Sequence, residues 1–265
     1  MEYLKFILYG LIQGLTEFIP VSSTAHLKTI SHLLGIDNPG PSLSAVMQIG
    51  SILAILWYFK DDIFTLKKNL KKKFFGYLLN KKLSKSIFIG TIPIVLLGGC
   101  IKLFVPIYFY QILSSNKSIG IVSLVMAFFM YLADCARKSF INIKNHKYSD
   151  SLLIGISQAF AIFPGVSRSG FTISTALLAG WDRKSAVKFS FLLGIPAISL
   201  AAIVELISAA NDILINFYPL IVGLTTTFLS SLVAIDFLFK YLPSNGLKIF
   251  IIYRVIFGII ILLNL

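Results

Sequence analysis

The sequence predicts an all-α polytopic membrane protein with six transmembrane helices plus two re-entrant helical hairpins, arranged as two inverted-topology repeats. Three observations predict this fold class. Of the 265 residues, 57% are hydrophobic and 13% are charged, whereas soluble domains are about 45–50% apolar and about 25% charged. Lysines and arginines gather in short segments between apolar runs. Two polar motifs, 145 positions apart, also match each other in part, without gaps.

A spanning helix needs about 20 mostly apolar residues. Six segments meet or nearly meet this length, at roughly 42–59, 86–106, 118–136, 188–208, 217–239 and 247–265. Cys100 and Cys135 lie in or at the end of such runs, and we expect small apolar-phase side chains rather than a disulfide. Glu205, Asp236 and Arg254 also fall in or near these spans, where we expect helix-end or ion-pairing roles.

Two further regions are apolar but interrupted. Each holds two short stretches: 3–18 and 23–35 around Pro20, and 151–163 and 168–179 around Pro164-Gly165. Proline removes a hydrogen-bond donor and glycine relaxes the backbone, so both regions should break and turn back as re-entrant hairpins. Asp150, just ahead of the second hairpin, has helix N-cap chemistry. The N-terminus has no basic n-region or cleavage site, so we do not expect a removable signal peptide.

The distribution of basic residues predicts the orientation in the membrane. Eighteen of the 24 lysines and arginines fall on one side of the six-span arrangement, in segments 60–85, 137–149, 181–188 and 240–248. Because positive loops stay in the cytoplasm, both termini should lie on the non-cytoplasmic side. We expect segment 60–85 to be a solvated topogenic loop, with anionic lipid or a partner as the alternative ligand. This distribution also argues against nucleic acid as a partner.

The two broken hairpins define two repeats, roughly 1–140 and 141–265. Each consists of a hairpin followed by three spans, and the hairpins enter from opposite sides of the membrane. Their tips should therefore meet near the midplane. Secondary transporters share this architecture, which makes a transporter or flippase of a phosphorylated lipid the main alternative function.

The first hairpin carries the motif QGLTEFIPVSSTAH. Gln13 and Glu17 are four residues apart and project from one helix face, where a carboxylate should meet a polar cavity or a cation. The next half-helix begins with hydroxyl side chains and His26 lies in its first turn; the hydroxyl residues are Ser22, Ser23 and Thr24. A helix N-terminus of this kind either is simply capped or binds an anion. His32 and His146 lie near segment ends, and we expect ordinary interfacial or loop roles for them.

The second hairpin carries the motif FPGVSRSGFTIS. Ser167, Ser169 and Thr172 repeat the hydroxyl pattern, and Arg168 adds a planar fork of donors suited to phosphate oxygens. An ion pair with Glu17 is the structural alternative for Arg168. Two half-helix N-termini, an arginine and several hydroxyls together predict a phosphate or diphosphate site. Because Glu17 repels such a ligand, we expect a divalent cation at Glu17, Mg²⁺ with Ca²⁺ as the alternative.

The two motifs closely resemble the signatures of the undecaprenyl-diphosphate phosphatase family, also called bacitracin-resistance proteins. The first signature is E/Q-x-x-x-E followed by PVSST and His, and the second is PGxSRSxxT. The resemblance extends over essentially the whole chain. Carried over by position, the expected site residues are Gln13, Glu17, Ser22, Ser23, His26, Ser167, Arg168, Ser169 and Thr172. The chain departs from the family pattern at Ala25, often glycine, and at Phe171, usually a small residue. Gln13 takes a variable position of the first motif.

The resemblance implies an activity and a location. The family removes one phosphate from the C55 isoprenoid diphosphate, which yields the monophosphate carrier for peptidoglycan synthesis and confers bacitracin resistance. It implies a divalent cation, the bacterial inner (plasma) membrane and the re-entrant inverted-repeat fold. Expected partners are the polyprenyl diphosphate lipid and the membrane, with a second copy of this chain as a further candidate.

The residues leave the mechanism open. Ser23 is the expected nucleophile, with an activated water as the alternative. His26 or Glu17 would act as the base, and Glu17 could instead hold the cation. A third class, the acid-phosphatase-like lipid phosphatases, also uses serine, histidine and arginine, but its separate lysine-arginine motif and second histidine motif are not found in this sequence.

Overall fold

The computed structural model describes residues 2–60, 81–106, 112–136, 140–209 and 216–264. Over these ranges the chain is helical, and the one β contact is an isolated bridge between Ile141 and Trp181. The first half contains α1 (Glu2–Phe18), α2 (Ser23–Leu34), α3 (Pro41–Tyr58), α5 (Lys81–Phe104) and α7 (Asn116–Asp134). The second half contains α8 (Tyr148–Ala159), a 3-10 turn (Phe160–Ile162), α9 (Arg168–Leu178), α10 (Arg183–Ser208), α12 (Phe217–Asn245) and α13 (Lys248–Asn264).

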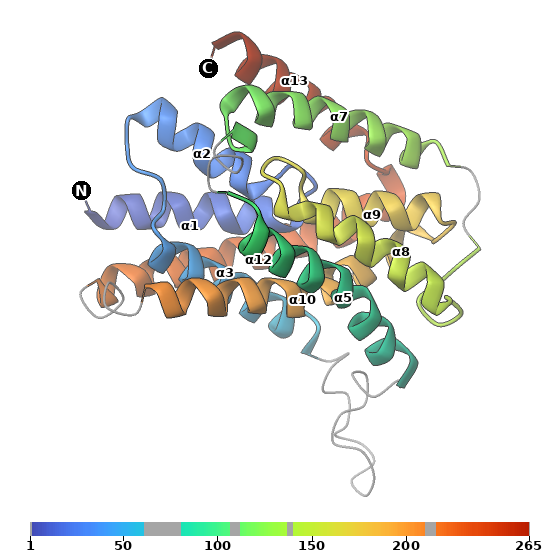
Figure 1. The fold of residues 1–265 in the computed structure, drawn as a ribbon. Coiled ribbons are helices and arrows are strands. Elements are labelled where there is room, and N and C mark those ends of the chain that lie inside the picture. The colour runs from blue at the N-terminus through green and yellow to red at the C-terminus, as the bar shows by residue number, and fades with distance from the viewer. Residues whose placement is uncertain (1, 61–80, 107–111, 137–139, 210–215, 265) are drawn as a thin grey trace, which may run out of the picture.

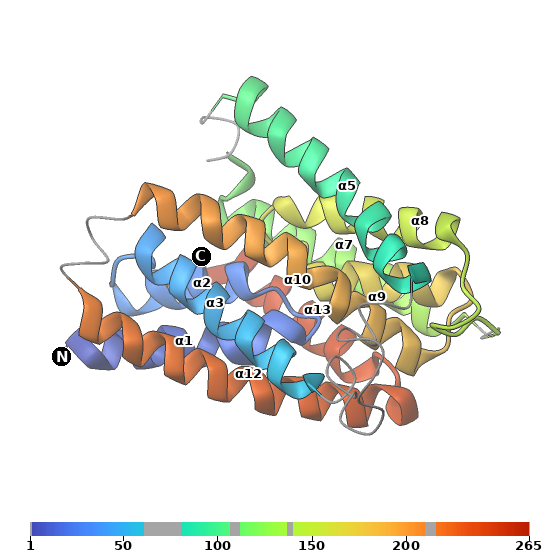
Figure 2. The same ribbon diagram turned by 90° about the horizontal axis from the view of Figure 1, so that it is seen from below.

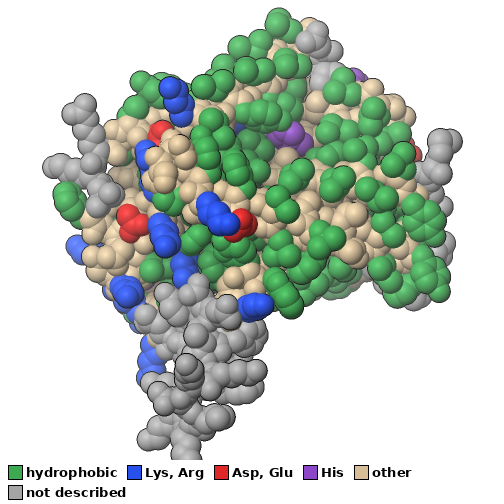
Figure 3. Space-filling model, turned by 180° about the vertical axis from the view of Figure 1, so that it is seen from behind, with side chains coloured by type: hydrophobic (Ala, Val, Ile, Leu, Met, Phe, Trp, Pro, Cys, Tyr) green, Lys and Arg blue, Asp and Glu red, His purple; other side chains and the backbone are tan. Residues whose placement is uncertain are grey.

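The all-helical, multi-pass membrane class is confirmed. Five helices, α3, α5, α7, α10 and α12, are long and apolar enough to cross a membrane. The sixth predicted span corresponds to α13, which has 17 residues. Figure 3 shows apolar side chains over most of one face, with lysines and arginines gathered toward one side of it. Most of the predicted basic loop 60–85 lies outside the described residues, as do Arg137 and Lys138.

Several helices extend beyond their predicted apolar runs. Helix α5 begins at Lys81 and α10 at Arg183, each five residues earlier than predicted, and α12 continues to Asn245. Polar and basic residues prolong a helix without adding hydropathy, so hydropathy marks the apolar core of a helix rather than its ends. The carboxylate of Asp182 caps α10 by accepting the Ser185 amide at 2.8 Å.

The N-cap prediction for Asp150 is wrong by position. Helix α8 begins at Tyr148, so Asp150 is its third residue, and its carboxylate accepts the Lys147 amide at 2.8 Å. The pairing predicted for Asp236 is confirmed, whereas Glu205 has an uncharged partner. Asp236 pairs with Lys240 at 2.7 Å, and Glu205 accepts a 2.9 Å hydrogen bond from Gln48. Both cysteines are free thiols.

Both hairpins turn at a strained serine. Ser22 has φ 77° and ψ 100°, and Ser167 has φ 67° and ψ 105°. Among the described residues these are the non-glycine residues with positive φ, and they are 145 positions apart. A side chain in this region costs on the order of 1–3 kcal/mol, so the surrounding packing must hold each turn.

The first helix of each hairpin packs against the other half of the chain. Helix α1 lies along α12, and α8 lies along α5; α3 also packs on α10, and α7 on α13 (Figures 1 and 2). Glycines allow these close contacts. A Cβ at Gly10 would overlap Thr226, and one at Gly155 would overlap the Gly90 carbonyl.

A central core lies directly beneath the hairpin turns. Phe18 from the end of α1 and Phe191 from α10 are fully buried, with ring centroids 5.2 Å apart in an edge-to-face arrangement. Ile173 of α9 and Leu193 of α10 belong to the same cluster. This packing joins the two hairpins to α10 and fixes where their polar turns meet.

Candidate active site

A pocket of about 260 Å³ lies where the two hairpin turns meet. Both hairpins supply a polar part of the lining, α3 adds two further polar side chains, and α5 and α10 supply apolar side chains. Its lining residues are Gln13, Glu17, Ser22, Ser23, Thr24, Leu27, Ser44, Gln48, Ile94, Ala161, Ile162, Ser167, Arg168, Ala197, Ile198 and Ala201. The structure thus brings seven of the predicted site residues to one cavity.

The Glu17 carboxylate is the centre of the polar part of the lining. Its Oε2 accepts hydrogen bonds from Gln13 Nε2 at 3.0 Å and from the Ser23 hydroxyl at 2.8 Å. Its Oε1 lies 3.3 Å from Arg168 Nη2, and the two side chains are 14% and 8% exposed. The ion pair between the hairpins is therefore present. A carboxylate offers about four lone-pair sites, so three donors leave room for a further ligand.

Arg168 is held in place by α10. Its Nη1 donates to the Ser190 carbonyl at 3.1 Å. A Cβ at Gly194 would overlap the guanidinium, so a side chain there would displace Arg168 from this position. The Nε of Arg168 is buried without a hydrogen-bond partner. An oriented guanidinium that lines a pocket is suited to an anionic ligand.

Two helix N-termini reach the same pocket. Helix α2 begins at Ser23 and α9 at Arg168. The Ser167 hydroxyl caps α9 by accepting the Gly170 amide at 3.2 Å, whereas the Ser22 hydroxyl makes no such cap and bonds to Thr24 at 3.2 Å. First-turn amides and the helix dipole both favour an anion at this point.

Three predicted site residues do not line the pocket and instead support those that do. His26 is 6% exposed and bonds to the Ser22 carbonyl and to Tyr253. The Ser169 hydroxyl donates to the Ile19 carbonyl of the first hairpin at 3.2 Å. Thr172 shares a 2.6 Å hydrogen bond with Ser190.

Arg254 is the residue whose importance the sequence did not reveal. It is fully buried in α13, and no carboxylate among the described residues pairs with it. Its Nη2 donates to the Gly165 carbonyl at 2.6 Å, and its Nη1 lies 3.5 Å from the Pro20 carbonyl. One side chain thus contacts both hairpin turns. The available signal was an arginine inside an apolar span, which is costly unless it is used.

A divalent cation fits this donor set only together with a phosphorylated ligand. In the described part of the chain, no group of three histidine, cysteine, aspartate or glutamate side chains could hold a metal. Glu17 supplies one hard oxygen ligand with a free lone-pair site. Mg²⁺ commonly binds through one or two carboxylates plus substrate phosphates and waters, and Glu17 fits that mode.

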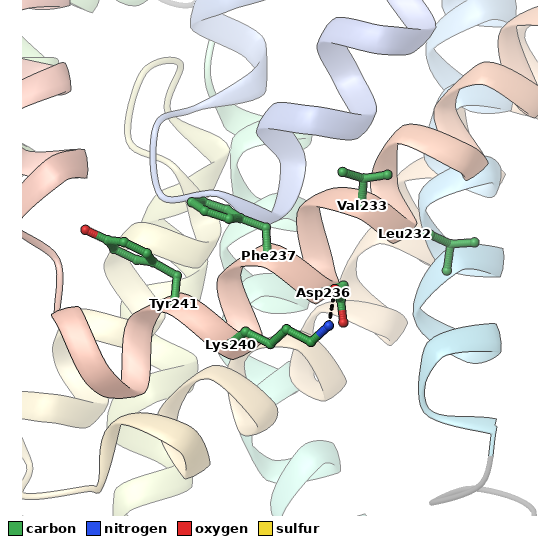
Figure 4. Close-up of a pocket in the computed structure, with 6 residues that line it drawn as sticks. All are labelled: Leu232, Val233, Asp236, Phe237, Lys240 and Tyr241. Carbon is green, nitrogen blue, oxygen red and sulfur yellow. Dashed lines mark hydrogen bonds and ion pairs between the residues drawn. The ribbon is translucent and has the colours of Figure 1, made fainter.

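A larger cavity of about 640 Å³ lies elsewhere and does not resemble a reaction site. Its lining comes from α12 alone: Leu232, Val233, Asp236, Phe237, Lys240 and Tyr241. In Figure 4, Lys240 turns toward Asp236, so the one cation and the one carboxylate neutralise each other. The Tyr58 hydroxyl of α3 also donates to Asp236, at 3.2 Å, so this carboxylate already has two partners within the protein.

Comparison with known proteins agrees with the motifs. The family described as Bacitracin resistance protein BacA matches residues 6–260. A protein named "Undecaprenyl-diphosphatase" from Prochlorococcus marinus strain AS9601 is 71% identical over 266 residues, covering 100% of this chain and 97% of that protein. One of the same name from strain MIT 9313 is 45% identical, covering 96% of this chain and 86% of that protein. The chain therefore belongs to the bacitracin resistance protein BacA family.

Proposed function

We propose that this protein is a membrane phosphatase that hydrolyses undecaprenyl diphosphate to undecaprenyl monophosphate and phosphate. The observation that carries the proposal is the junction of Glu17, Ser23 and Arg168 at two helix N-termini, in the polar part of a largely apolar pocket. The relatives named "Undecaprenyl-diphosphatase" support it. The product would re-enter peptidoglycan synthesis as lipid carrier, which accounts for bacitracin resistance.

The pocket accommodates the two chemical parts of such a substrate. The diphosphate lies at the hairpin turns, where the α2 and α9 N-termini and Arg168 supply positive potential. The first isoprene units lie against apolar side chains of the lining, among them Leu27, Ile94 and Ile198. The remaining tail extends along the apolar surface toward lipid.

Ser23 is the proposed nucleophile and Glu17 its base. The Ser23 oxygen attacks the terminal phosphorus while its proton passes to Glu17 Oε2, to which it already donates at 2.8 Å. A serine–phosphorus bond forms as the anhydride bond breaks and the lipid monophosphate leaves. The leaving lipid monophosphate takes this proton from Glu17. Water then attacks the phosphoserine and gives its proton to Glu17, which returns it to the Ser23 oxygen as inorganic phosphate leaves. Arg168 neutralises the charge on the equatorial oxygens of the transferred group.

Glu17 and the diphosphate oxygens would together hold a divalent cation, most simply Mg²⁺ with Ca²⁺ as the alternative. When bound, the ion would offset the repulsion between the carboxylate and the diphosphate and would neutralise charge on the phosphate oxygens. Gln13 fixes the carboxylate from its other side. The diphosphate is bound by hydroxyls that line the pocket, those of Ser22, Thr24 and Ser167. The hairpin turns are held in place by Ser169 and Thr172.

The proposed topology is six membrane crossings plus two re-entrant hairpins, in inverted repeats 1–140 and 141–265. The helix pairs support it, because exchanging the halves turns the α1–α12 pair into the α8–α5 pair. The α3–α10 and α7–α13 pairs each join a helix of one repeat to the corresponding helix of the other, so the exchange leaves these pairs unchanged. The matching turns at Ser22 and Ser167 lie at the corresponding positions. This arrangement belongs in the bacterial inner membrane.

The pocket would be reached from the non-cytoplasmic side, where the basic-residue distribution puts both termini. The two chain ends lie on the same side of the molecule in Figures 1 and 2. The pocket extends toward the beginning of α3, at Ser44 and Gln48, and toward the later part of α10, at Ala201. Under the proposed orientation, both of these regions are non-cytoplasmic.

The decisive experiment is phosphate release by the purified protein from a polyprenyl diphosphate in detergent with Mg²⁺. We expect turnover by the wild type and almost none by Arg168→Ala. No release by the wild type, or undiminished release by Arg168→Ala, would contradict the assignment. Movement of the intact lipid diphosphate across proteoliposomes without release would favour the transporter alternative.

A further inference from the structure

His26 packs against aromatic side chains of α13 and does not line the pocket. Its ring stacks on Phe257, with centroids 4.4 Å apart and planes 4° apart, and also lies nearly parallel to Tyr253. Its Nδ1 is 2.7 Å from the Ser22 carbonyl oxygen and its Nε2 is 2.6 Å from the Tyr253 hydroxyl. Both ring nitrogens are thus occupied by groups of the protein.

These two contacts determine which nitrogen of the His26 ring carries the proton. A carbonyl oxygen only accepts hydrogen bonds, so Nδ1 carries the proton and donates it to Ser22. In a neutral imidazole, Nε2 is then an acceptor, and the Tyr253 hydroxyl must donate to it. Tyr253 therefore selects the tautomer in which His26 can hold the Ser22 carbonyl.

The corresponding turn in the second hairpin lacks a side-chain donor like that of His26. Ser167 adopts nearly the same backbone conformation as Ser22, and its own hydroxyl caps the following helix. The position matching His26 is Phe171, which offers Ser167 only its backbone amide, at 3.0 Å. In the first hairpin the ring of His26 supplies an additional donor to the turn. The Ser22 hydroxyl is then not used as a cap and lines the pocket.

We propose that Tyr253 is a positioning residue for the phosphatase reaction and acts through His26. Its hydroxyl holds His26 as a donor to the Ser22 carbonyl, and this contact keeps the strained turn in the conformation that places Ser22 and Ser23 at the pocket. Neither Tyr253 nor His26 touches the substrate in this arrangement. The inference rests on the proposed function and assigns His26 a role other than general base.

The kinetic test uses substitutions that separate these roles. Tyr253→Phe keeps the ring and loses the hydroxyl, and we expect kcat to fall about 5- to 20-fold with KM for the lipid within about twofold. In His26→Asn the side-chain amide can still donate to Ser22, so this variant should retain more activity than His26→Ala. Adding Tyr253→Phe to His26→Asn should then change nothing further. The matched control is Tyr58→Phe, which removes a hydroxyl that donates to Asp236 of α12, outside the pocket lining.

A spectroscopic measurement tests the geometry independently of activity. With ¹⁵N-labelled histidine, the His26 signals should show a protonated Nδ1 and a hydrogen-bonded, unprotonated Nε2, and Tyr253→Phe should shift the Nε2 signal. A protonated Nε2 in the wild type, a Tyr253→Phe variant with unchanged kcat, or equal loss of activity in His26→Asn and His26→Ala would each overturn the inference. A wild type without phosphate release would contradict the proposed function and with it the catalytic part of this inference, whereas the nitrogen shifts separately decide whether Tyr253 holds the His26 tautomer.

Discussion

The Ser23 hydroxyl donates a 2.8 Å hydrogen bond to the Glu17 carboxylate across the break in the first hairpin. The two residues lie on different helices, at the end of α1 and the start of α2, and Pro20 and the positive-φ Ser22 separate them. A hydroxyl in contact with a carboxylate that could take its proton is the usual arrangement of an activated nucleophile. The hairpin break therefore creates the chemical pair at the centre of the proposed site.

Ser23→Ala should remove the nucleophile. We expect phosphate release to fall about 1,000-fold or more, because Glu17 then has no hydroxyl to activate. Acid quenching with substrate labelled in the terminal phosphate should trap a phosphoserine in the wild type and not in the variant. The control is Ser208→Ala, which removes a hydroxyl outside the pocket lining that bonds to the Glu205 carbonyl, and this variant should still form the labelled phosphoserine. A Ser23→Ala variant with more than a tenth of wild-type turnover would point to direct attack by water.

Arg168→Lys should keep the charge and lose the oriented fork. Lysine cannot bond both the Ser190 carbonyl and Glu17 while also donating to a phosphate, so we expect turnover to fall about 100-fold. The control is Arg183→Lys, in which the changed residue pairs with Asp134 outside the pocket. Steady-state phosphate release from both variants measures the effect. Equal losses would show that general stability, not Arg168, is being measured.

Removal of divalent cations should stop the reaction. Chelation with EDTA is expected to abolish phosphate release and Mg²⁺ to restore it, because Glu17 and the diphosphate are both anionic. Glu17→Gln should lower turnover and raise the Mg²⁺ concentration needed for half-maximal activity. Thermal unfolding supplies a second readout: Mg²⁺ should stabilise the protein together with inorganic diphosphate more than alone. Full activity in EDTA would exclude this role for Glu17.

Arg254→Met should destabilise the junction of the hairpins. The substitution leaves the buried carbonyls of Gly165 and Pro20 without a donor, at a cost of about 1–3 kcal/mol for each unsatisfied group. We expect a lower unfolding temperature in detergent, lower phosphate release, and partial recovery of both in Arg254→Lys. Lys248→Met, at the exposed start of the same helix, should behave as the wild type does. Unchanged stability in Arg254→Met would show that the carbonyl contacts are dispensable.

His146 should make the protein less stable at acid pH. Burial lowers its pKa, Lys82 lowers it further, and the Ile143 carbonyl and Asp150 oppose the shift. A lowered pKa means that the unfolded chain takes up the proton first. Stability is therefore constant above about pH 6.5, the ordinary histidine value, and falls as the pH drops below it.

Thermal unfolding between pH 8 and pH 5 tests this expectation. In the neutral ring, Nδ1 donates to the Ile143 carbonyl at 2.9 Å and Nε2 accepts from Ser86 at 2.7 Å. His146→Gln should have a flatter profile over this range. A wild-type profile that is flat from pH 7 to pH 5 would contradict the prediction.

The sequence by itself determined the class of protein, the helix positions and the composition of the site. Apolar runs, separated by basic segments, predicted all the long helices to within six residues at either end, because lipid imposes a strong requirement on composition. Pro20 and Pro164-Gly165 located both hairpin turns. Glu17, Ser23 and Arg168 were recognisable because charged and polar residues are costly in a membrane unless they are used.

Only the tertiary structure decided which of these residues line the pocket and which hold the hairpin turns in place. The positive-φ turn at Ser22 aims Ser23 at Glu17, and packing against Tyr253 and Phe257 draws His26 away from the pocket. Arg254 became important through contacts with turns 89 and 234 residues away in sequence. Helical spacing fixes which residues share a face, but it does not determine which distant helix that face meets. That choice depends on the packing of the two halves of the chain against each other.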